Sequence, residues 1–215
     1  MINKKIAQSY DFVTRGVEKL ITKINNDAYG AMNEATLQHH LAMNIHLDSL
    51  QQHRCNLSMI LEKKVLREND VYPKTRKNSA NIDVLFTDRD NGVRCAIELK
   101  CFHRVNHREP NNRYDAYADI ANLEAYLGDH ADVGVFVLFT DHPHYFDNNF
   151  RAHSHKTNDF CLRQNHQYKA GRILSYQTET PHGPDIVLRL NYKFSWQNLE
   201  GRWKVLVLKV SEEEK

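Results

Sequence analysis

The stretch NIDVLFTDRDNGVRCAIELK, from Asn81 to Lys100, decides the fold of this chain. It contains two apolar segments joined by a polar turn, which is the pattern of an antiparallel hairpin. Three charged residues, Asp83, Glu98 and Lys100, nevertheless interrupt the apolar segments. Residues directly opposite one another in such a pair point to the same face of the sheet, so the length of the turn determines where these charges lie.

Two turn geometries gather the three charges on one face. A two-residue type I′ turn at residues 91–92, which their Asn-Gly dipeptide favours, places Asp83 opposite Lys100 with Glu98 one diagonal step away. A four-residue loop over 89–92 places Asp83 directly opposite Glu98 instead. An odd-length loop would separate Asp83 from the other two charges, and we expect a loop of even length.

On such a face the carboxylates of Asp83 and Glu98 lie close together beside the amine of Lys100. Two close carboxylates in apolar surroundings repel each other and resist desolvation unless a cation or a proton joins them. Hard oxygen ligands with room for water and a phosphate suit Mg²⁺ or Mn²⁺ better than zinc. Such an ion polarises a phosphoryl oxygen and helps to generate hydroxide, while a lysine positions water or balances charge. The pattern predicts phosphodiester hydrolysis.

The flanking segments predict a mixed α/β fold. Apolar residues recur at helical spacing from Lys4 to about Asn25, and Asn33 is placed to cap a second helix from Glu34 to about Gln51. Residues 57–66 are ambiguous by period but alternate at Leu57, Met59 and Leu61, which favours a strand. A helical period returns from Tyr114 to Leu127, and the apolar run over 133–139 is typical of a central strand buried on both faces. Strand, helix and buried strand together predict a right-handed crossover unit.

The remaining segments predict loops and a closing pair of strands. Residues 101–113 are polar, and we expect them to be irregular and mobile. Residues 141–167 are rich in His, Asp and Asn and indicate a surface loop, while 185–194 and 203–210 indicate two strands around the sequence QNLEG. We expect one domain over residues 1–215, with a helical part over 1–53, a catalytic core over about 54–140 and a C-terminal loop and strand pair over 141–215.

Composition indicates an ordinary folded protein and excludes several classes. Of the 215 residues, 41% are hydrophobic and 26% are charged, which argues against a disordered chain. The longest apolar run is too short to cross a bilayer and the N-terminus lacks the apolar core of a signal peptide, so we expect a cytoplasmic protein without a membrane partner. The four cysteines have no CxxC spacing and are expected to be free thiols. A net charge of +2 permits an anionic partner.

Asp83, a short hairpin and the triplet Glu98-Leu99-Lys100 together resemble the D…ExK core of the PD-(D/E)xK nuclease superfamily. The resemblance extends from the second helix to the strand at 133–139 and implies the restriction-endonuclease-like fold, a mixed central sheet flanked by helices. It also implies that Asp83, Glu98 and the backbone carbonyl of Leu99 bind one or two Mg²⁺ or Mn²⁺ ions. Lys100 would then assist the attacking water.

Members of this superfamily often add a glutamate from a preceding helix, and Glu34 is the candidate here. Helical spacing places it on the same stripe as the apolar residues of its helix, although an acidic residue in a first turn also simply favours the helix dipole. Asn122 and Tyr126 have the spacing of the QxxxY element of RecB-like members, with Asn in place of Gln. That difference argues against a processive exonuclease. Ile82 also replaces the proline of the motif.

Basic residues flank the hairpin on both sides and favour a nucleic-acid partner, DNA above all, through salt-sensitive phosphate contacts. The sequence thus predicts an endodeoxyribonuclease, and the resemblance alone adds a possible homodimer. These basic residues are Lys74, Arg76, Lys77, Arg104, Arg108 and Arg113.

Three other interpretations stay open from the sequence. A catalytically inactive nucleic-acid-binding or assembly protein could keep the nuclease-like fold, because fold does not fix function. The charges of Asp83, Glu98 and Lys100 could form a solvent-facing salt bridge, worth about 0–1 kcal/mol. The His-rich segment over 142–166 could hold zinc, although its spacing matches no strong zinc signature. Its candidate ligands are His142, His144, His153, His155, Asp159, Cys161 and His166.

Overall fold

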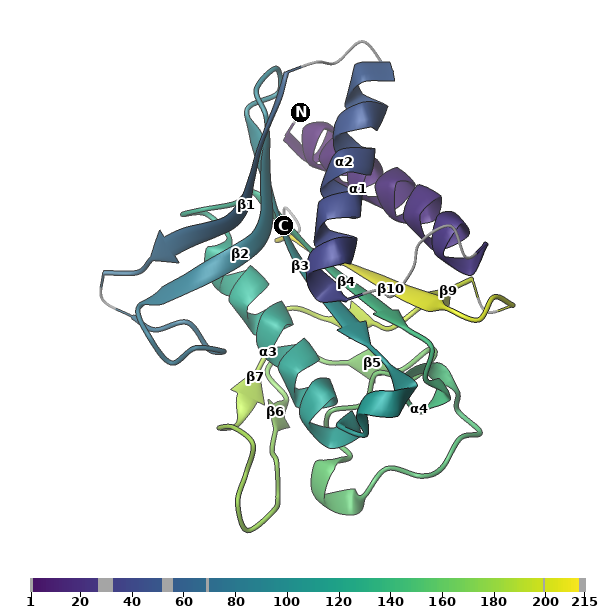
Figure 1. The fold of residues 1–215 in the computed structure, drawn as a ribbon. Coiled ribbons are helices and arrows are strands. Elements are labelled where there is room, and N and C mark those ends of the chain that lie inside the picture. The colour runs from purple at the N-terminus through teal and green to yellow at the C-terminus, as the bar shows by residue number, and fades with distance from the viewer. Residues whose placement is uncertain (1, 27–32, 52–55, 69, 199, 213–215) are drawn as a thin grey trace.

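A mixed sheet of six strands with helices against it forms the centre of the computed structural model (Figure 1), which describes residues 2–26, 33–51, 56–68, 70–198 and 200–212. The strand order is β1-β2-β3-β4-β10-β9, and the pair β3–β4 is parallel. The mixed α/β class predicted from the sequence is therefore confirmed. The helices are α1 (Ile2–Asn25), α2 (Glu34–Gln51), α3 (Glu109–Tyr126) and α4 (Pro143–Phe146), with 3-10 turns η1 (Arg104–Asn106) and η2 (His155–Thr157).

The strands differ greatly in length. The first four and the last are long and form the body of the sheet, and the five between them are short. The strands are β1 (Leu57–Leu66), β2 (Ser79–Asp88), β3 (Val93–Phe102), β4 (Val133–Thr140), β5 (Gln167–Tyr168), β6 (Ile173–Leu174), β7 (Ile186–Val187), β8 (Tyr192–Lys193), β9 (Trp196–Gln197) and β10 (Lys204–Val210).

Helices α1 and α2 cover one face of the sheet (Figure 1), at the positions predicted from their apolar spacing. Helix α2 begins at Glu34 because Asn33 precedes it as a cap: the backbone N–H of Thr36 donates to Asn33 Oδ1 over 2.8 Å. Leu41 and Ile45 of this helix join one apolar cluster with residues of β2, β3 and β4. The packing of α2 on the sheet therefore holds Glu34 beside Lys100, near the end of β3.

The hairpin β2–β3 closes with the four-residue loop, and the two-residue Asn-Gly turn is wrong. Asp88 pairs with Val93, and the N–H of Gly92 donates to the carbonyl of Asp88 over 2.7 Å. The Asp88 carboxylate explains this choice, because it accepts from the backbone N–H groups of Asp90 and Asn91 over 3.1 Å each. An aspartate that bonds the backbone ahead of it stabilises its own turn. Gly92 takes the left-handed φ of 68° that closes the loop.

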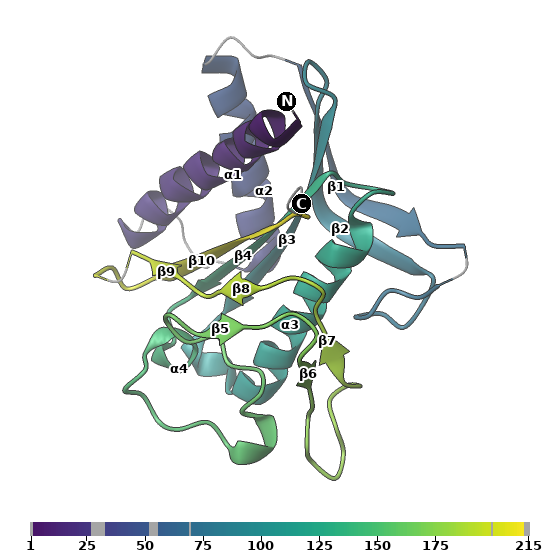
Figure 2. The same cartoon turned by 180° about the vertical axis from the view of Figure 1, so that it is seen from behind.

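Helix α3 lies on the opposite face of the sheet and connects the parallel strands β3 and β4 (Figure 2). All eight residues of β4 are buried, as its continuous apolar run predicts. The helix begins at Glu109, earlier than predicted, because Pro110 suits a first helical turn. The expectation of an irregular segment over 101–113 was therefore wrong at both of its ends, where β3 and α3 extend into it.

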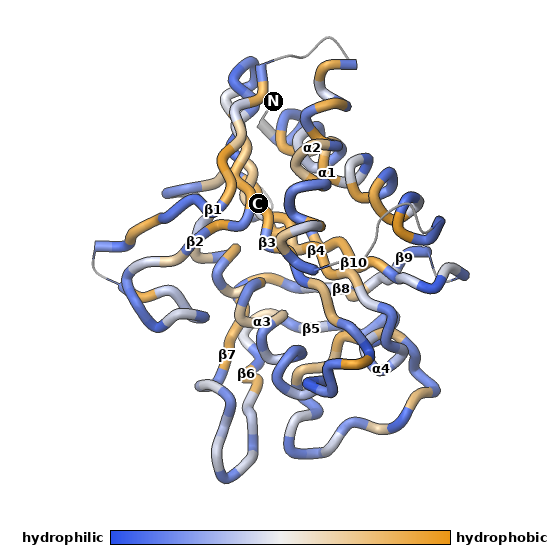
Figure 3. The backbone as a smooth tube through the Cα atoms, in the orientation of Figure 1, coloured by the Kyte–Doolittle hydropathy of each residue, from blue (hydrophilic) through white to orange (hydrophobic). Residues whose placement is uncertain are grey.

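The C-terminal segment corrects a second expectation. Residues 185–194 do not pair with 203–210: they contribute β7 and β8, which pair with β6 and β5, while β10 lies between β4 and β9. Apolar side chains of this segment, such as Tyr192 and Phe194, pack into the cluster around α3. Figure 3 shows apolar segments along β3, β4 and β10, which lie between α1 and α2 on one face of the sheet and α3 on the other. Helix α3 is thus covered on both sides, which buries several of its polar residues.

Two smaller expectations concern cysteines and membranes. Cys95, Cys101 and Cys161 are free thiols, as predicted, and Cys55 lies outside the described residues. In the described ranges, no helix has both the length and the apolar character needed to cross a bilayer.

Candidate active site

The two motif strands bring Asp83 and Glu98 together where β2 and β3 part. Paired residues run from Asp88–Val93 to Val84–Ile97, and the next step of this register sets Asp83 opposite Glu98. At that point the Asp83 carboxylate replaces the backbone partner: the N–H of Leu99 donates to Asp83 Oδ2 over 2.7 Å. The carboxylate is therefore fixed against the strand that carries Glu98.

On its other side Asp83 lies opposite an irregular residue of β1. Leu61 pairs with Val84 and Lys63 with Ile82, which leaves Glu62 beside Asp83 with a φ of 52°. Gln38 of α2 donates to Glu62 Oε1 over 3.1 Å and also to the backbone carbonyl of Asp83. Strands β1 and β2 curve away from the rest of the sheet along their length (Figure 1). The β2–β3 pairing ends at Val84 and Ile97, beside the two carboxylates.

Glu98 is almost completely buried, with 1% of its surface exposed. The hydroxyl of Tyr126 on α3 donates to Glu98 Oε1 over 3.1 Å. Burial, followed by repulsion from Asp83 and Asp119, raises the pKa of Glu98 well above its ordinary value. Burial is also the main cause that raises the pKa of Asp83, to about 6. The two carboxylates therefore resist carrying charge together, as their positions in the sequence predicted.

The amine of Lys100 is held by two hydrogen bonds and a further ion pair. Its Nζ lies 2.8 Å from Glu34 Oε1, 2.9 Å from the carbonyl oxygen of Leu99 and 3.3 Å from Asp119 Oδ2. Burial opposes the charge on this amine, but Asp119, Glu34 and Asp83 outweigh it and raise its pKa above the ordinary value. The structure thus brings Glu34 to the predicted motif residues, and the carbonyl of Leu99 faces the same amine.

Sequence reasoning missed Asp119, which lies at the centre of the cluster with none of its surface exposed. Its second oxygen, Oδ1, is 2.6 Å from the Nζ of Lys74. Asp119, Asn122 and Tyr126 are three and four residues apart and so share one face of α3. Asn122 Oδ1 accepts from the backbone N–H of Lys74 over 3.1 Å. The spacing of Asp119 from the Asn122–Tyr126 pair was the signal that could have identified it.

Two cavities border this cluster, and Lys74 lines both. A cavity of about 310 Å³ is lined by Glu34, Lys100 and Arg108, among others. A second cavity of about 360 Å³ is lined by Glu62, Lys77, Asp83 and Asn122, among others. Lys100 therefore lines the first cavity and Asp83 the second, and Lys74, which lines both, is paired with the buried Asp119.

Most of the predicted basic residues lie at the surface, with one exception. Arg76, Lys77, Arg104 and Arg108 are exposed. Arg113 is only 1% exposed and donates inward, to His153 Nδ1 and the carbonyl oxygen of Thr157 over 2.9 Å each, because the C-terminal segment covers its helix. Burial is the main cause that lowers its pKa, to about 10. Arg113 therefore holds the loop in place, and its prediction as a nucleic-acid contact is corrected.

The described residues contain no preassembled metal site. No three His, Cys, Asp or Glu side chains stand close enough in them to surround an ion by themselves, either at the motif or in the His-rich segment. In that segment His142 Nε2 lies 2.9 Å from Glu109 Oε1, and His144 stacks on His153 with ring centroids 4.6 Å apart. Mg²⁺ usually takes only one or two carboxylates and keeps several waters. The pair Asp83 and Glu98 fits that donor set.

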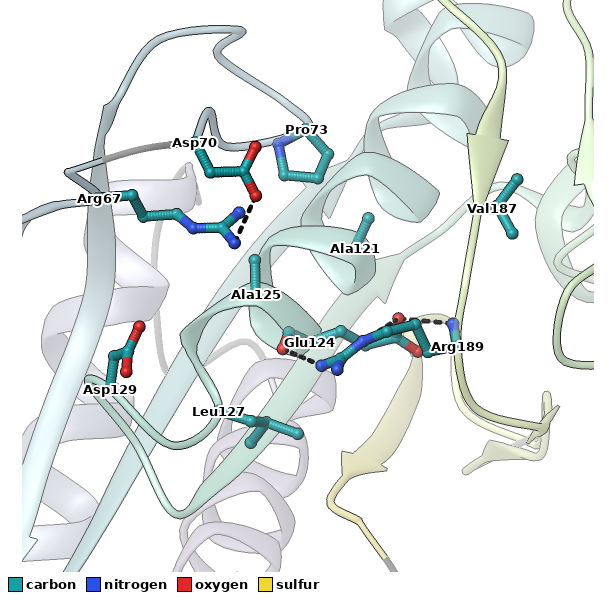
Figure 4. A pocket seen from close by; sticks show the side chains of 10 residues that line it. All are labelled: Arg67, Asp70, Pro73, Ala121, Glu124, Ala125, Leu127, Asp129, Val187 and Arg189. Atoms are coloured by element: carbon teal, nitrogen blue, oxygen red, sulfur yellow. Dashed lines mark hydrogen bonds and ion pairs between the residues drawn. The ribbon is translucent and has the colours of Figure 1, made fainter.

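A third cavity, of about 330 Å³, lies on the other side of α3 (Figure 4). Two arginines line it, and each is already paired with a carboxylate: Arg67 with Asp70 at 2.6 Å and Arg189 with Glu124 at 3.8 Å. Glu124 also accepts from the backbone N–H of Arg189 over 2.7 Å, so it ties the C-terminal segment to the helix. We assign this cavity a structural role and leave it out of the site.

Comparisons with known proteins do not identify a family. No family model matches the chain, and no curated protein matches it. A search of solved structures finds the crystal structure of SSO0001, with 19% sequence identity and a TM-score of 0.28. The match covers 60% of this chain and 60% of that one, so the chain spans less than two thirds of the structure that it matches. A likeness this weak carries no argument about fold or function.

Proposed function

We propose that this protein is a Mg²⁺- or Mn²⁺-dependent nuclease with a restriction-endonuclease-like fold, most specifically an endodeoxyribonuclease. One observation carries the proposal: Asp83 is fixed against β3 by its 2.7 Å bond from Leu99, beside the buried Glu98 and the Lys100 amine. Asp83 lines a cavity, and the raised pKa values of Asp83 and the buried Glu98 indicate a site suited to a cation.

A divalent ion bound by Asp83 and Glu98 would polarise a phosphate oxygen and make a bound water more acidic. The raised pKa of Lys100 keeps its amine protonated, so this residue serves as a donor to the water or to developing negative charge, and not as a base. Glu34 remains 45% exposed and is the candidate acceptor for the proton of the water. Tyr126 orients the carboxylate of Glu98 through its hydrogen bond.

The substrate proposed for this site is a nucleic acid, because basic side chains border both cavities. Arg108 lines one cavity and Lys77 the other, and Arg76 and Arg104 are exposed on the same two loops. Contacts from such residues to phosphates give binding that depends strongly on salt and little on sequence. The helix-flanked sheet supplies the scaffold.

The test is hydrolysis by the purified protein of supercoiled DNA, linear DNA and RNA, each with Mg²⁺, with Mn²⁺ and with EDTA. Glu98→Gln and Lys100→Ala remove the proposed machinery, while Glu179→Gln and Lys193→Ala change the same charges at exposed positions outside both cavities. We expect metal-dependent cleavage by the wild type and both controls, and a loss of about 100-fold or more in the two site variants.

Two other results would contradict the proposal. Equal cleavage by all five proteins would identify a contaminating nuclease. Salt-sensitive DNA binding without any metal-dependent hydrolysis would support the catalytically inactive binding protein instead. Light scattering of the same samples tests the homodimer that the superfamily resemblance implies: a mass of twice 25.2 kDa supports it.

A further inference from the structure

The loop before β2 crosses the candidate active site and carries Lys74 into it. The backbone of this residue is anchored by Asn122, over 3.1 Å, and its amine by Asp119, over 2.6 Å. Both anchors come from the same face of α3. Lys74 therefore lines both the cavity that Lys100 lines and the cavity that Asp83 lines.

A phosphodiester that reacts at this site must contact both cavities at once. Its phosphorus has to lie near the carboxylates of Asp83 and Glu98, and the attacking water has to lie near the Lys100 amine. Lys74, which lines both cavities, is held by its ion pair with Asp119. Asp119 also binds Lys100, so a single buried carboxylate holds two amines in place.

We propose that the pair of Lys74 and Asp119 is a latch, and that the sugar-phosphate backbone of the substrate opens it by taking Asp119's place as the partner of Lys74. The exchange trades one anionic oxygen for another, so Lys74 keeps a charged partner throughout. The movement of the side chain joins the two cavities into one groove over Asp83, Glu98 and Lys100. This inference rests on the proposed function and adds a residue that selects and admits its substrate.

The chemistry of the pair suits such an exchange. Asp119 is completely buried, whereas the side chain of Lys74 is 36% exposed and so can reach a phosphate in solvent. Burial opposes the charge of Lys74, and Asp119 is the largest influence that raises its pKa in return. The negative charge of a phosphate would favour the charged amine of Lys74 in the same way. Asp119 keeps Lys100 as a partner when Lys74 leaves, so the exchange does not strand a buried charge without a counter-ion.

The experiment measures binding and not cleavage. A fluorescein-labelled deoxyoligonucleotide is titrated with protein in EDTA, and anisotropy gives its Kd for the wild type, Asp119→Asn, Lys74→Ala and the double variant. Asp119→Asn releases Lys74, so we expect Kd to fall by about threefold or more. Lys74→Ala raises Kd, and Asp119→Asn has no further effect in the Lys74→Ala background.

Matched controls separate the latch from a general change in charge. Asp115→Asn removes a carboxylate that also borders the site, but that pairs with His182 at 2.9 Å. Lys193→Ala removes an exposed amine far along the chain, in β8. An equal gain in affinity from Asp115→Asn, or a gain from Asp119→Asn that persists without Lys74, would overturn the latch.

A salt titration gives a second readout that needs only the exposed Lys74 to be changed. Loss of one phosphate contact should reduce the slope of log K against log salt by about one in Lys74→Ala. An unchanged slope would overturn the exchange of partners even if Asp119→Asn failed to fold. Failure of the latch leaves metal-dependent hydrolysis intact, whereas an absence of oligonucleotide binding by every variant would overturn the latch and the proposed function together.

Discussion

Tyr126 of α3 donates a hydrogen bond from its hydroxyl to Oε1 of Glu98 on β3, over 3.1 Å. The bond joins the helix to the strand that it follows in the chain. It is shielded on one side by Tyr72, whose ring centroid lies 5.3 Å from that of Tyr126. Because Glu98 is buried, this hydroxyl is part of what fixes the direction of its carboxylate.

Loss of that hydroxyl should therefore impair catalysis more than binding. In Tyr126→Phe we expect kcat to fall by roughly 10- to 100-fold with KM little changed. Hydrogen bonds that orient a metal-binding side chain typically contribute that much to activity. Steady-state kinetics on DNA with Mn²⁺ measure both constants. The matched control is Tyr72→Phe, because the Tyr72 hydroxyl is buried without a hydrogen-bond partner among the described residues. Equal losses in the two variants would contradict the assigned role.

Glu98 should lower the stability of the fold when no metal ion is bound. Replacement by Gln removes a buried charge beside Asp83 and Asp119 and keeps an oxygen for Tyr126. We expect Glu98→Gln to unfold at a Tm higher by about 2–4 °C in EDTA at pH 8, which corresponds to about 1 kcal/mol for a domain of this size, while activity is lost. Thermal unfolding measures the change. A lower Tm would show that Glu98 stabilises the fold instead.

Arg113 should affect stability, in contrast to the exposed arginines of the site. Arg113→Met leaves buried acceptors in the loop over 153–160 without donors, so we expect a loss of roughly 2–4 kcal/mol in the free energy of unfolding. Arg108→Met, at an exposed position, should change it by less than about 0.5 kcal/mol and weaken DNA binding. Urea unfolding compares the two. Equal stability of both variants would contradict the structural role of Arg113.

The same loop predicts a dependence of stability on acid. Burial and then the charge of Arg113 lower the pKa of His153 to about 3, and the same two causes lower the pKa of His144 to about 4. Their ordinary value is near 6.5, so the stability that the neutral rings contribute is complete above pH 6.5 and is lost as the pH falls toward these lowered values. Between pH 7 and 4.5, His153→Gln should lose about 2 kcal/mol less than the wild type. Urea unfolding at the two pH values gives both losses, and identical losses would contradict the burial of a neutral His153.

Local patterns in the sequence predicted the elements and the motif, because alternation, helical period and a cap act over a few residues. The register needed one further detail, the bonds from the Asp88 carboxylate to its own loop, which favour four loop residues over the Asn-Gly turn. Arg113 was predicted to lie at the surface and Asp119 was missed, since polar residues on a helix usually face water. Here the segment after β4 takes the donors of Arg113, while Asp119 faces Lys74 and Lys100. The pairing of that segment depends on contacts distant in sequence.

The location of a bound metal ion tests the central claim most directly. Crystals soaked in Mn²⁺ and measured at the manganese absorption edge give an anomalous difference map that identifies the ion by element. The account predicts a peak within bonding distance of the carboxylates of both Asp83 and Glu98, and its absence in crystals of Glu98→Gln. Mn²⁺ bound elsewhere would contradict the account. So would a well-ordered Asp83 carboxylate that has no ion beside it at saturating Mn²⁺.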